Sequence, residues 1–482
     1  MDPRTRRLLE APIGSTLVRL AMPNVLVMVV QAMIGLIETY FVAKLGVDAL
    51  AAMALVFPPY MLLVMVSAGA MGGGILSSIA RALGSGDGEK ANALVWHAIA
   101  ITLLFSATTT VAARLWAPDL YALMGGRAGS LRDAIIYSNI IFSAAIPLWL
   151  FNSMAAMIRA TGNTLLPAAV ITVGAVVLIP VSPLLIFGIG PFPALGIAGG
   201  AVAVLFYYVI GGAVFAFYLW SGRGVLQPSF VPVRLRWQPM GEILRIGIAS
   251  SITSLSTNVT AIVATGLAGV IGPAAVAGYG TGVRLEYLLV PLVFGLGQPV
   301  GAMVGTAIGA GRHERALRVA WIGAAIAGGL TEAIGLTAAL FPTAWLTMFG
   351  AEQQMIAVGA DYLRIVGPFY GFFGVGLAFY FAAQGAGRLR WPMIAAVTRV
   401  LIAAAGGTIA IHVMHGVAAL FAVLALALVV FGLMNAAAVG FGAWVPRKDA
   451  SLIPPAEAVA AAAGRWDGRR RACGAGGPAR DR

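Results

Sequence analysis

The chain has 482 residues, of which 60% are apolar and 10% are charged, and its formal net charge at pH 7 is +13. This composition excludes a soluble globular protein and predicts a membrane protein with many spanning segments. The basic excess does not indicate nucleic-acid binding, because positive residues of membrane proteins gather in the loops that stay on the cytoplasmic side.

Twelve long apolar segments dominate the sequence. A bilayer core of about 30 Å requires roughly 20 apolar residues per helix. By this criterion the predicted spans are 16–42, 50–80, 91–113, 134–157, 165–189, 194–220, 242–270, 282–308, 316–340, 357–382, 392–411 and 416–441. No alternating strand pattern of about ten residues is present, so the expected fold is an all-α polytopic membrane protein.

Charged loops predict the orientation of these spans. One set of alternate connections holds Arg4, Arg6, Arg7, Arg81, Lys90, Arg159, Arg223, Arg234, Arg236, Arg312, Arg315, Arg318, Arg388 and Arg390. The other set holds Lys44, Arg114, Arg127 and Arg132. Because basic loops remain in the cytoplasm, both termini are expected there.

The first span carries a polar stripe. Asn24, Gln31 and Glu38 are spaced by seven residues, and a helix drifts only about 20° per heptad, so they share one face. Burial disfavours the Glu38 anion, so a proton and a cation can compete for its oxygens. The alternative is that Glu38 is a buried structural partner for Lys44 or for a nearby arginine.

The chain repeats itself at an offset of 225 residues. The loop Ala82–Ala91 is echoed by Ala307–Ala316, with Gly84 matching Gly309, and Tyr137 matches Tyr362. Two halves of six helices with the same orientation follow, an architecture that transporters use to hold substrate between halves. The expected organisation is an N-terminal segment (1–15), an N-lobe (16–220), a cytoplasmic linker (221–240), a C-lobe (241–441) and a disordered tail (442–482).

The C-lobe has its own polar residues. The seventh span carries Ser250, Thr253, Ser254 and Thr257 along one side with Asn258 adjacent, and these residues either line a cavity or tie helices together. Arg284 and Glu286 point to different sides of the eighth span and should not pair with each other. Glu286 or Glu332 can instead form a structural ion pair with Arg399.

Enzyme chemistry is not indicated. His97, His313, His412 and His415 show no metal-ligand or nucleophile–base spacing, and a phosphate-binding P-loop is absent. The single Cys473 lies in the tail and excludes a disulfide framework. No cofactor other than a coupling ion is expected, and no firm metal site.

Several motifs together resemble one family. They are Gly35–Gly46, the Gly-x-Gly basic loops around Gly84 and Gly309, Arg159–Asn163 and Ala383–Gly387. In order and spacing they resemble the multidrug and toxic compound extrusion (MATE) transporters, particularly their DinF-like bacterial branch, from Ser15 to Phe441. The resemblance implies a V-shaped pair of six-helix lobes in the bacterial inner membrane, exporting lipophilic or cationic compounds in exchange for H⁺ or Na⁺.

The resemblance places Glu38 where that branch has a functional acid, which makes Na⁺ binding there one reading. An Asp before Pro in the branch's fifth helix is Ser182 here, and the NorM-like carboxylate of the seventh helix is missing, so the coupling ion stays open. The candidate ion-coupling or substrate residues are Glu38, Gln31, Asn24, Tyr40, Asn152, Ser182, Asn258, Glu286, Glu332 and Arg399.

The expected partners are organic cations or amphiphiles and membrane lipids, with no nucleic acid, and the chain is expected to be a monomer. A second hypothesis is a flippase or exporter of a lipid-linked or polyanionic amphiphile. Arg364 and Arg399 would suit a phosphate-bearing ligand, whereas Glu38 suits a cation. A non-transporting membrane scaffold is a third reading.

Overall fold

The computed structural model describes residues 2–124, 126–143, 145–349, 352–414 and 416–442. The predicted disordered tail, apart from Gly442, lies outside the described residues, as do Cys473 and His415. The described residues are helical with short connections, and they contain no strand.

The first half of the chain forms the helices of the N-lobe, which follow one another with short connections. Two of its spans are interrupted, one by a π-helical turn and one by a bend. The elements are α1 (Pro3–Glu10), α2 (Ile13–Ala43), α3 (Val47–Val64), π-helical η1 (Met65–Met71), α4 (Gly72–Gly84), α5 (Gly88–Leu123), α6 (Ala128–Ser143), α7 (Ala145–Ala160), α8 (Leu165–Phe187) and α9 (Ile197–Trp220).

The second half repeats this plan in the C-lobe, with two irregular turns inside its spans. The elements are α10 (Trp237–Ile271), α11 (Pro273–Gly309), α12 (His313–Leu340), α13 (Pro342–Leu346), α14 (Gln353–Val366), 3-10 helical η2 (Gly367–Phe369), α15 (Tyr370–Ala386), α16 (Arg390–Leu401), π-helical η3 (Ile402–Gly406), α17 (Gly407–Met414) and α18 (Val417–Gly440).

The spans agree with those predicted. Among the described residues, eleven helical segments are long and apolar enough to cross a membrane, and there are twelve when α6 and α7, which meet at a bend, count as one. The predicted all-α polytopic fold with twelve spans is therefore confirmed. The helices are long because they are apolar on all sides and lie in lipid. A shorter helix would end inside the lipid and leave backbone N–H and C=O groups without partners.

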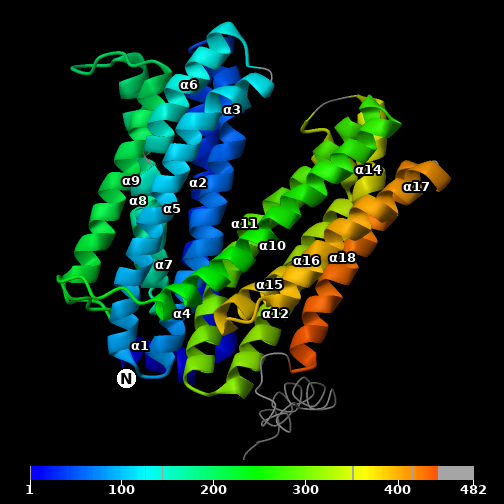
Figure 1. Cartoon of the computed structure of the whole chain (residues 1–482). Coiled ribbons are helices and arrows are strands. Elements are labelled where there is room, and N and C mark those ends of the chain that lie inside the picture. The colour runs from blue at the N-terminus through cyan, green and yellow to red at the C-terminus, as the bar shows by residue number, and fades with distance from the viewer. Residues whose placement is uncertain (1, 125, 144, 350–351, 415, 443–482) are drawn as a thin grey trace, which may run out of the picture.

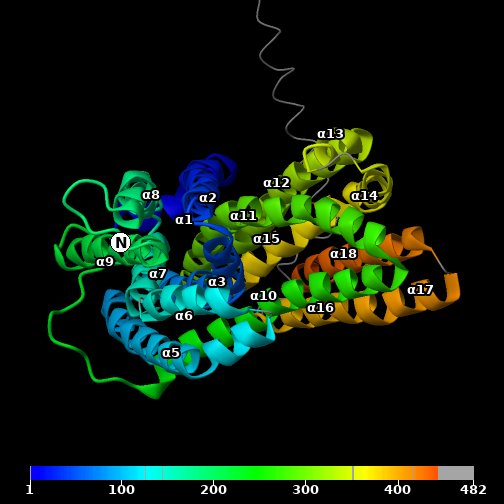
Figure 2. The same ribbon diagram turned by 90° about the horizontal axis from the view of Figure 1, so that it is seen from above.

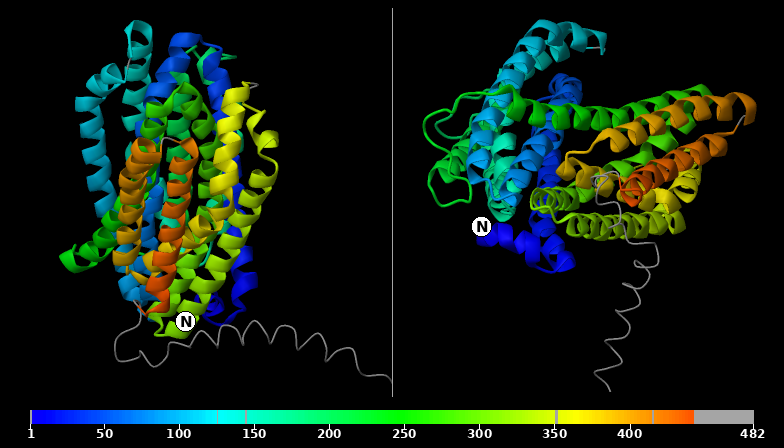
Figure 3. Two further views of the ribbon diagram at one scale, coloured as in Figure 1. Left: turned by 90° about the vertical axis from the view of Figure 1, so that its right-hand side faces the viewer. Right: turned by 60° about the horizontal axis from the view of Figure 1, so that its bottom comes forward.

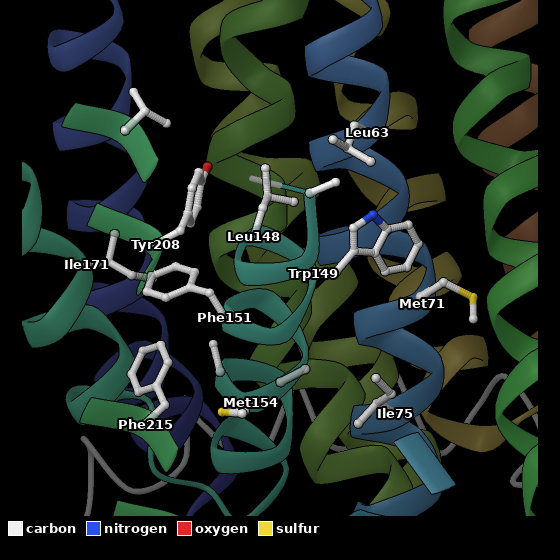
Figure 4. Close-up of a cluster of buried hydrophobic side chains, with 14 of the residues drawn as sticks. Leu63, Met71, Ile75, Leu148, Trp149, Phe151, Met154, Ile171, Tyr208 and Phe215 are labelled. Atoms are coloured by element: carbon white, nitrogen blue, oxygen red, sulfur yellow. The ribbon is translucent and has the colours of Figure 1, made fainter. Parts of the chain in front are cut away.

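Two hydrophobic cores hold the bundles together. The N-lobe core includes Trp149, Phe151, Tyr208 and Phe215, which Figure 4 shows on neighbouring helices, and a second core fills the C-lobe. Figure 1 shows two bundles that meet at the end where the N-terminus lies and diverge toward α6 and α14, and Figure 2 shows the two bundles side by side from above. We call the end where the two bundles meet the closed end, and Figure 3 shows that the N-terminus lies there.

Helix α2 stands between the two bundles and packs against both α8 and α11. The short helix α1 before it also touches both lobes. Leu8 and Leu9 are buried in the C-lobe core, whereas the Arg4 guanidinium donates to the Tyr218 hydroxyl of the N-lobe at 3.0 Å. The N-terminal segment therefore bridges the two bundles at the closed end.

Candidate functional site

Glu38 lies near the C-terminal end of α2 and has no ionic partner among the described residues. Its Oε1 atom is buried and receives no hydrogen bond from the part of the chain that the structure describes. The ammonium of Lys44, an alternative partner, lies instead 4.6 Å from the centroid of the Tyr40 ring. Since a buried carboxylate without a cation is costly, this group is set apart from the structural ion pairs of the chain.

Several tyrosines lie within electrostatic range of Glu38. They are Tyr60 from α3, Tyr137 from α6 and Tyr208 from α9. The hydroxyls of Tyr60 and Tyr208 are 2.9 Å apart and hydrogen-bonded. Tyr207 stacks edge-on against Tyr208 with ring centroids 5.0 Å apart. Three helices thus place phenol groups in the neighbourhood of Glu38.

The rest of the predicted polar stripe on α2 is divided between different surroundings. Asn24 is buried, and its Nδ2 atom has no hydrogen-bond partner. Gln31 is exposed, and its amide contacts the Tyr207 hydroxyl. Tyr40 is 59% exposed, and the Lys44 ammonium lies over its ring. Gln31 therefore lies beside Tyr207, the ring neighbour of Tyr208.

The next three candidates lie outside α2: Asn152 and Ser182 belong to the N-lobe, and Asn258 belongs to α10. Asn152 donates from Nδ2 to Ser67 Oγ in η1 at 2.8 Å. Asn258 donates to the Ser254 carbonyl at 3.1 Å and contacts Met65 Sδ of η1 at 3.8 Å, so it reaches the N-lobe. Ser182 is buried in α8, and its hydroxyl has no partner. Asn152 and Asn258 thus lie at η1 and Ser182 lies in α8, and no hydrogen bond or ion pair among the described residues joins them to Glu38.

The hydroxyls along α10 mostly serve their own helix. Thr253, Ser256, Thr257 and Thr260 each donate to the carbonyl four residues earlier, at 2.8 to 3.4 Å. Such bonds satisfy the hydroxyl inside an apolar environment. Ser250 is different, because its Oγ accepts from Gln384 Nε2 of α15 at 2.8 Å.

The C-lobe holds a buried ion pair. Arg399 Nη2 donates to Glu286 Oε1 at 2.5 Å, and the two side chains are only 6% and 13% exposed. The Tyr362 hydroxyl donates to the other Glu286 oxygen at 3.4 Å. The guanidinium also lies over the Phe373 ring at 5.1 Å. Of the two predicted alternatives for Arg399, the structure makes the pair with Glu286.

Glu332 is separate from this pair, because its Oε2 accepts from the Gly371 backbone N–H at 2.7 Å. The Arg284 guanidinium lies 5.0 Å from the centroid of the Phe349 ring, so it does not pair with Glu286, as expected. A cavity of about 20 Å³ beside Glu286 and Arg399 has room for about one water molecule. It is too small for an organic compound.

The tyrosines were not found from the sequence, although one signal was present. Tyr137 and Tyr362 match at the repeat offset, and each stands beside the acid of its own lobe, Glu38 or Glu286. The acids themselves do not match at that offset. The tyrosine that recurs at the repeat offset was therefore the sequence signal that could have pointed to both sites.

Comparison with known proteins places the chain in a family. The MatE family model matches residues 23–184 and 249–409, one stretch in each half of the chain. The chain belongs to the MatE family. Membership of the MATE transporters, expected from the motifs, is thereby confirmed, whereas the DinF-like branch stays a prediction.

Relatives and solved structures of MATE proteins agree with this assignment. The chain is 27% identical to a "FAD transporter" of Shewanella oneidensis over 77% of this chain and 82% of that protein. It is 25% identical to a "Probable multidrug resistance protein NorM" of Thermotoga maritima, covering 80% and 83%. A crystal structure of a MATE protein in the bent conformation has a TM-score of 0.85 at 21% identity, covering 94% of this chain and 100% of that one.

An outward-facing MATE structure has a TM-score of 0.81 at 22% identity, covering 90% of this chain and 97% of that one. These likenesses show the two-lobed MATE fold. With the family model and the curated relatives, they identify the chain as a membrane transporter of the MATE family, whose relatives include multidrug efflux proteins.

Proposed function

We propose that this MATE protein exports lipophilic or cationic organic compounds in exchange for inward H⁺ or Na⁺, with Glu38 as the residue that carries the coupling ion. The observation that supports this proposal most is the surroundings of Glu38. Its carboxylate has a buried oxygen without a donor, tyrosines from three helices and no cationic partner among the described residues. Such a group requires a proton, a metal ion or a cationic ligand to offset its desolvation.

The tyrosines give the site its preference for cations. Aromatic faces attract organic cations by about 0.5 to 2 kcal/mol each, and the carboxylate adds a negative charge. A proton or Na⁺ on Glu38 would therefore compete with a bound cation for the same oxygens. Release of the compound on one side and of the coupling ion on the other then requires alternating access between the lobes.

A flux assay tests this proposal. Purified protein is reconstituted into liposomes, and uptake of a fluorescent organic cation is measured under an imposed pH or Na⁺ gradient. We expect the gradient to drive uptake and Glu38→Gln to lower the driven rate at least tenfold. The matched control is Glu314→Gln, because Glu314 is an exposed acid whose ion pair with Arg318 lies within one helix. Gradient-independent uptake, or equal losses in both variants, would refute the role of Glu38.

A flavin nucleotide is the second candidate substrate, because one relative is named a FAD transporter. The arginine expected to favour an anionic amphiphile, Arg399, is held by Glu286, and the cavity beside it admits only water. The same liposomes loaded with FAD decide between the candidates: FAD flux without cation flux would replace the first candidate by the second.

We further propose that the transporter works as a monomer in the bacterial inner membrane, with both termini in the cytoplasm and membrane lipids around it. The charge distribution of the loops supports this orientation. Labelling of a cysteine introduced at Arg6, in intact cells and in inverted vesicles, tests it. Labelling in inverted vesicles only is the expected result, and labelling in intact cells would reverse the orientation.

A further inference from the structure

The two repeated glycine loops meet at the closed end. A methyl group added to Gly84 would collide with the carbonyl of Thr306, and one added to Gly309 would collide with the carbonyl of Arg81. Thr306 stands 225 residues after Arg81, which is also the offset between Gly84 and Gly309. Thr306 is therefore the repeat equivalent of Arg81. The repeated glycines therefore let the ends of α4 and α11 approach backbone to backbone, each in the same way.

A polar network fastens this contact across the lobes. Arg81 of α4 donates from Nη2 to Glu242 Oε1 of α10 at 2.6 Å, and from Nη1 to the Gly385 carbonyl of α15 at 3.1 Å. Ser77, one turn earlier on α4, donates to the Gln384 carbonyl at 2.5 Å. Arg81 also hydrogen-bonds to Ser77. One N-lobe helix is thus bonded to two C-lobe helices.

The network has a second cation and continues inward from the closed end. Lys90 at the start of α5 lies 3.6 Å from the other oxygen of Glu242. The Gln384 side chain donates to Ser250 Oγ at 2.8 Å and to the Gly69 carbonyl of η1 at 3.3 Å. Backbone and side chain of Gln384 therefore both contribute to the junction between the lobes.

Among the described residues, the ion pairs of Glu242 differ from the others in joining the two lobes. Arg6–Glu10 and Arg318–Glu314 lie within single helices, and Arg399–Glu286 lies within the C-lobe. The repeat does not supply a second copy of this network. Leu17 stands at the position equivalent to Glu242, and Thr306 stands at the position equivalent to Arg81. Its loss would not be offset by a second copy elsewhere in the molecule.

We propose that Arg81 and Glu242 are positioning residues that hold the lobes together at the closed end, and that their ion pair must break before this end can open. This inference rests on the proposed alternating access. The pair suits such a role, because its side chains are 16% and 29% exposed. Water can therefore reach both charges as soon as the lobes separate, which lowers the cost of breaking a charge-assisted bond.

Cysteine labelling tests the proposal in the full chain. Thr306 is 1% exposed at the junction and its hydroxyl bonds only to its own helix, so Thr306→Cys serves as a reporter after Cys473→Ser. The reagent is a charged maleimide, applied to protein in nanodiscs. We expect Glu242→Gln to speed labelling roughly tenfold, since a charge-assisted bond of intermediate exposure is lost. Glu314→Gln, which removes an intrahelical pair, should leave the rate unchanged.

Two further variants separate opening from misfolding. Glu242→Asp, which keeps the negative charge between Arg81 and Lys90, should label more slowly than Glu242→Gln, and Gly84→Ala should raise the rate by forcing the helices apart. A rate in Glu242→Gln equal to that in Glu314→Gln, or a rate in Glu242→Asp as fast as that in Glu242→Gln, overturns the proposal. The flux assay with Glu38→Gln distinguishes this failure from failure of the proposed function, because Glu38 takes no part in the junction.

Discussion

Replacing Arg399 by Met should destabilise the C-lobe, because it leaves the Glu286 carboxylate buried without a counter-charge. The two side chains are 6% and 13% exposed and the closest N–O distance is 2.5 Å. Two charges about 4 Å apart interact by roughly 4 kcal/mol at an effective dielectric constant of about 20. Removing one partner of a buried pair typically costs about 3 to 5 kcal/mol. We expect a loss of that size.

Thermal unfolding in detergent, followed by the loss of monodisperse protein on size exclusion, measures this effect. The double variant Arg399→Met with Glu286→Gln should regain most of the loss, because no charge is then stranded. Arg318→Met is the matched control: its partner Glu314 is exposed, so about 0.5 kcal/mol at most is expected. A double variant no more stable than Arg399→Met would refute the reasoning, as would a single variant as stable as the parent.

Two further predictions concern the N-lobe site and the N-terminal helix. Tyr208→Phe removes the 2.9 Å bond to Tyr60. It should weaken binding of an organic cation about two- to tenfold in the flux assay while costing about 1 kcal/mol of stability at most; unchanged half-saturation would contradict a role for these hydroxyls. Arg315→Ala removes the bonds to the Leu8 and Ala11 carbonyls at 3.0 and 2.6 Å. Hydrogen exchange of the α1 amides should then rise at least tenfold, and unaltered protection would show that apolar burial alone holds α1.

The sequence determined the number and position of the membrane spans. Each span is an apolar run long enough to cross a bilayer, and this property depends on local composition alone. The repeat was equally readable, because the loops around Gly84 and Gly309 keep their residues at one offset. The structure adds the reason for the repeat, since each glycine makes room for the backbone of the other half.

Only the tertiary structure decided which polar groups meet. The sequence offered Glu286 and Glu332 as partners for Arg399, and packing of α16 against its neighbours selected Glu286. The sequence also left open whether Lys44 neutralises Glu38. In the structure Lys44, the C-cap of α2, lies over the ring of Tyr40 four residues earlier. Hydropathy is the same for any rotation of a helix that is apolar all round, so periodicity could not say which faces touch.

The same limit explains the residues that sequence reasoning missed. Tyr60, Tyr137 and Tyr208 come from three helices, and Arg81 meets Glu242 across 161 positions of the chain. No local pattern specifies such contacts, because they arise from the way long helices cross and from how closely their small residues let them approach. Composition therefore determined what enters the membrane, and helix packing decided which of the described charges inside it are paired with another charge and which are not.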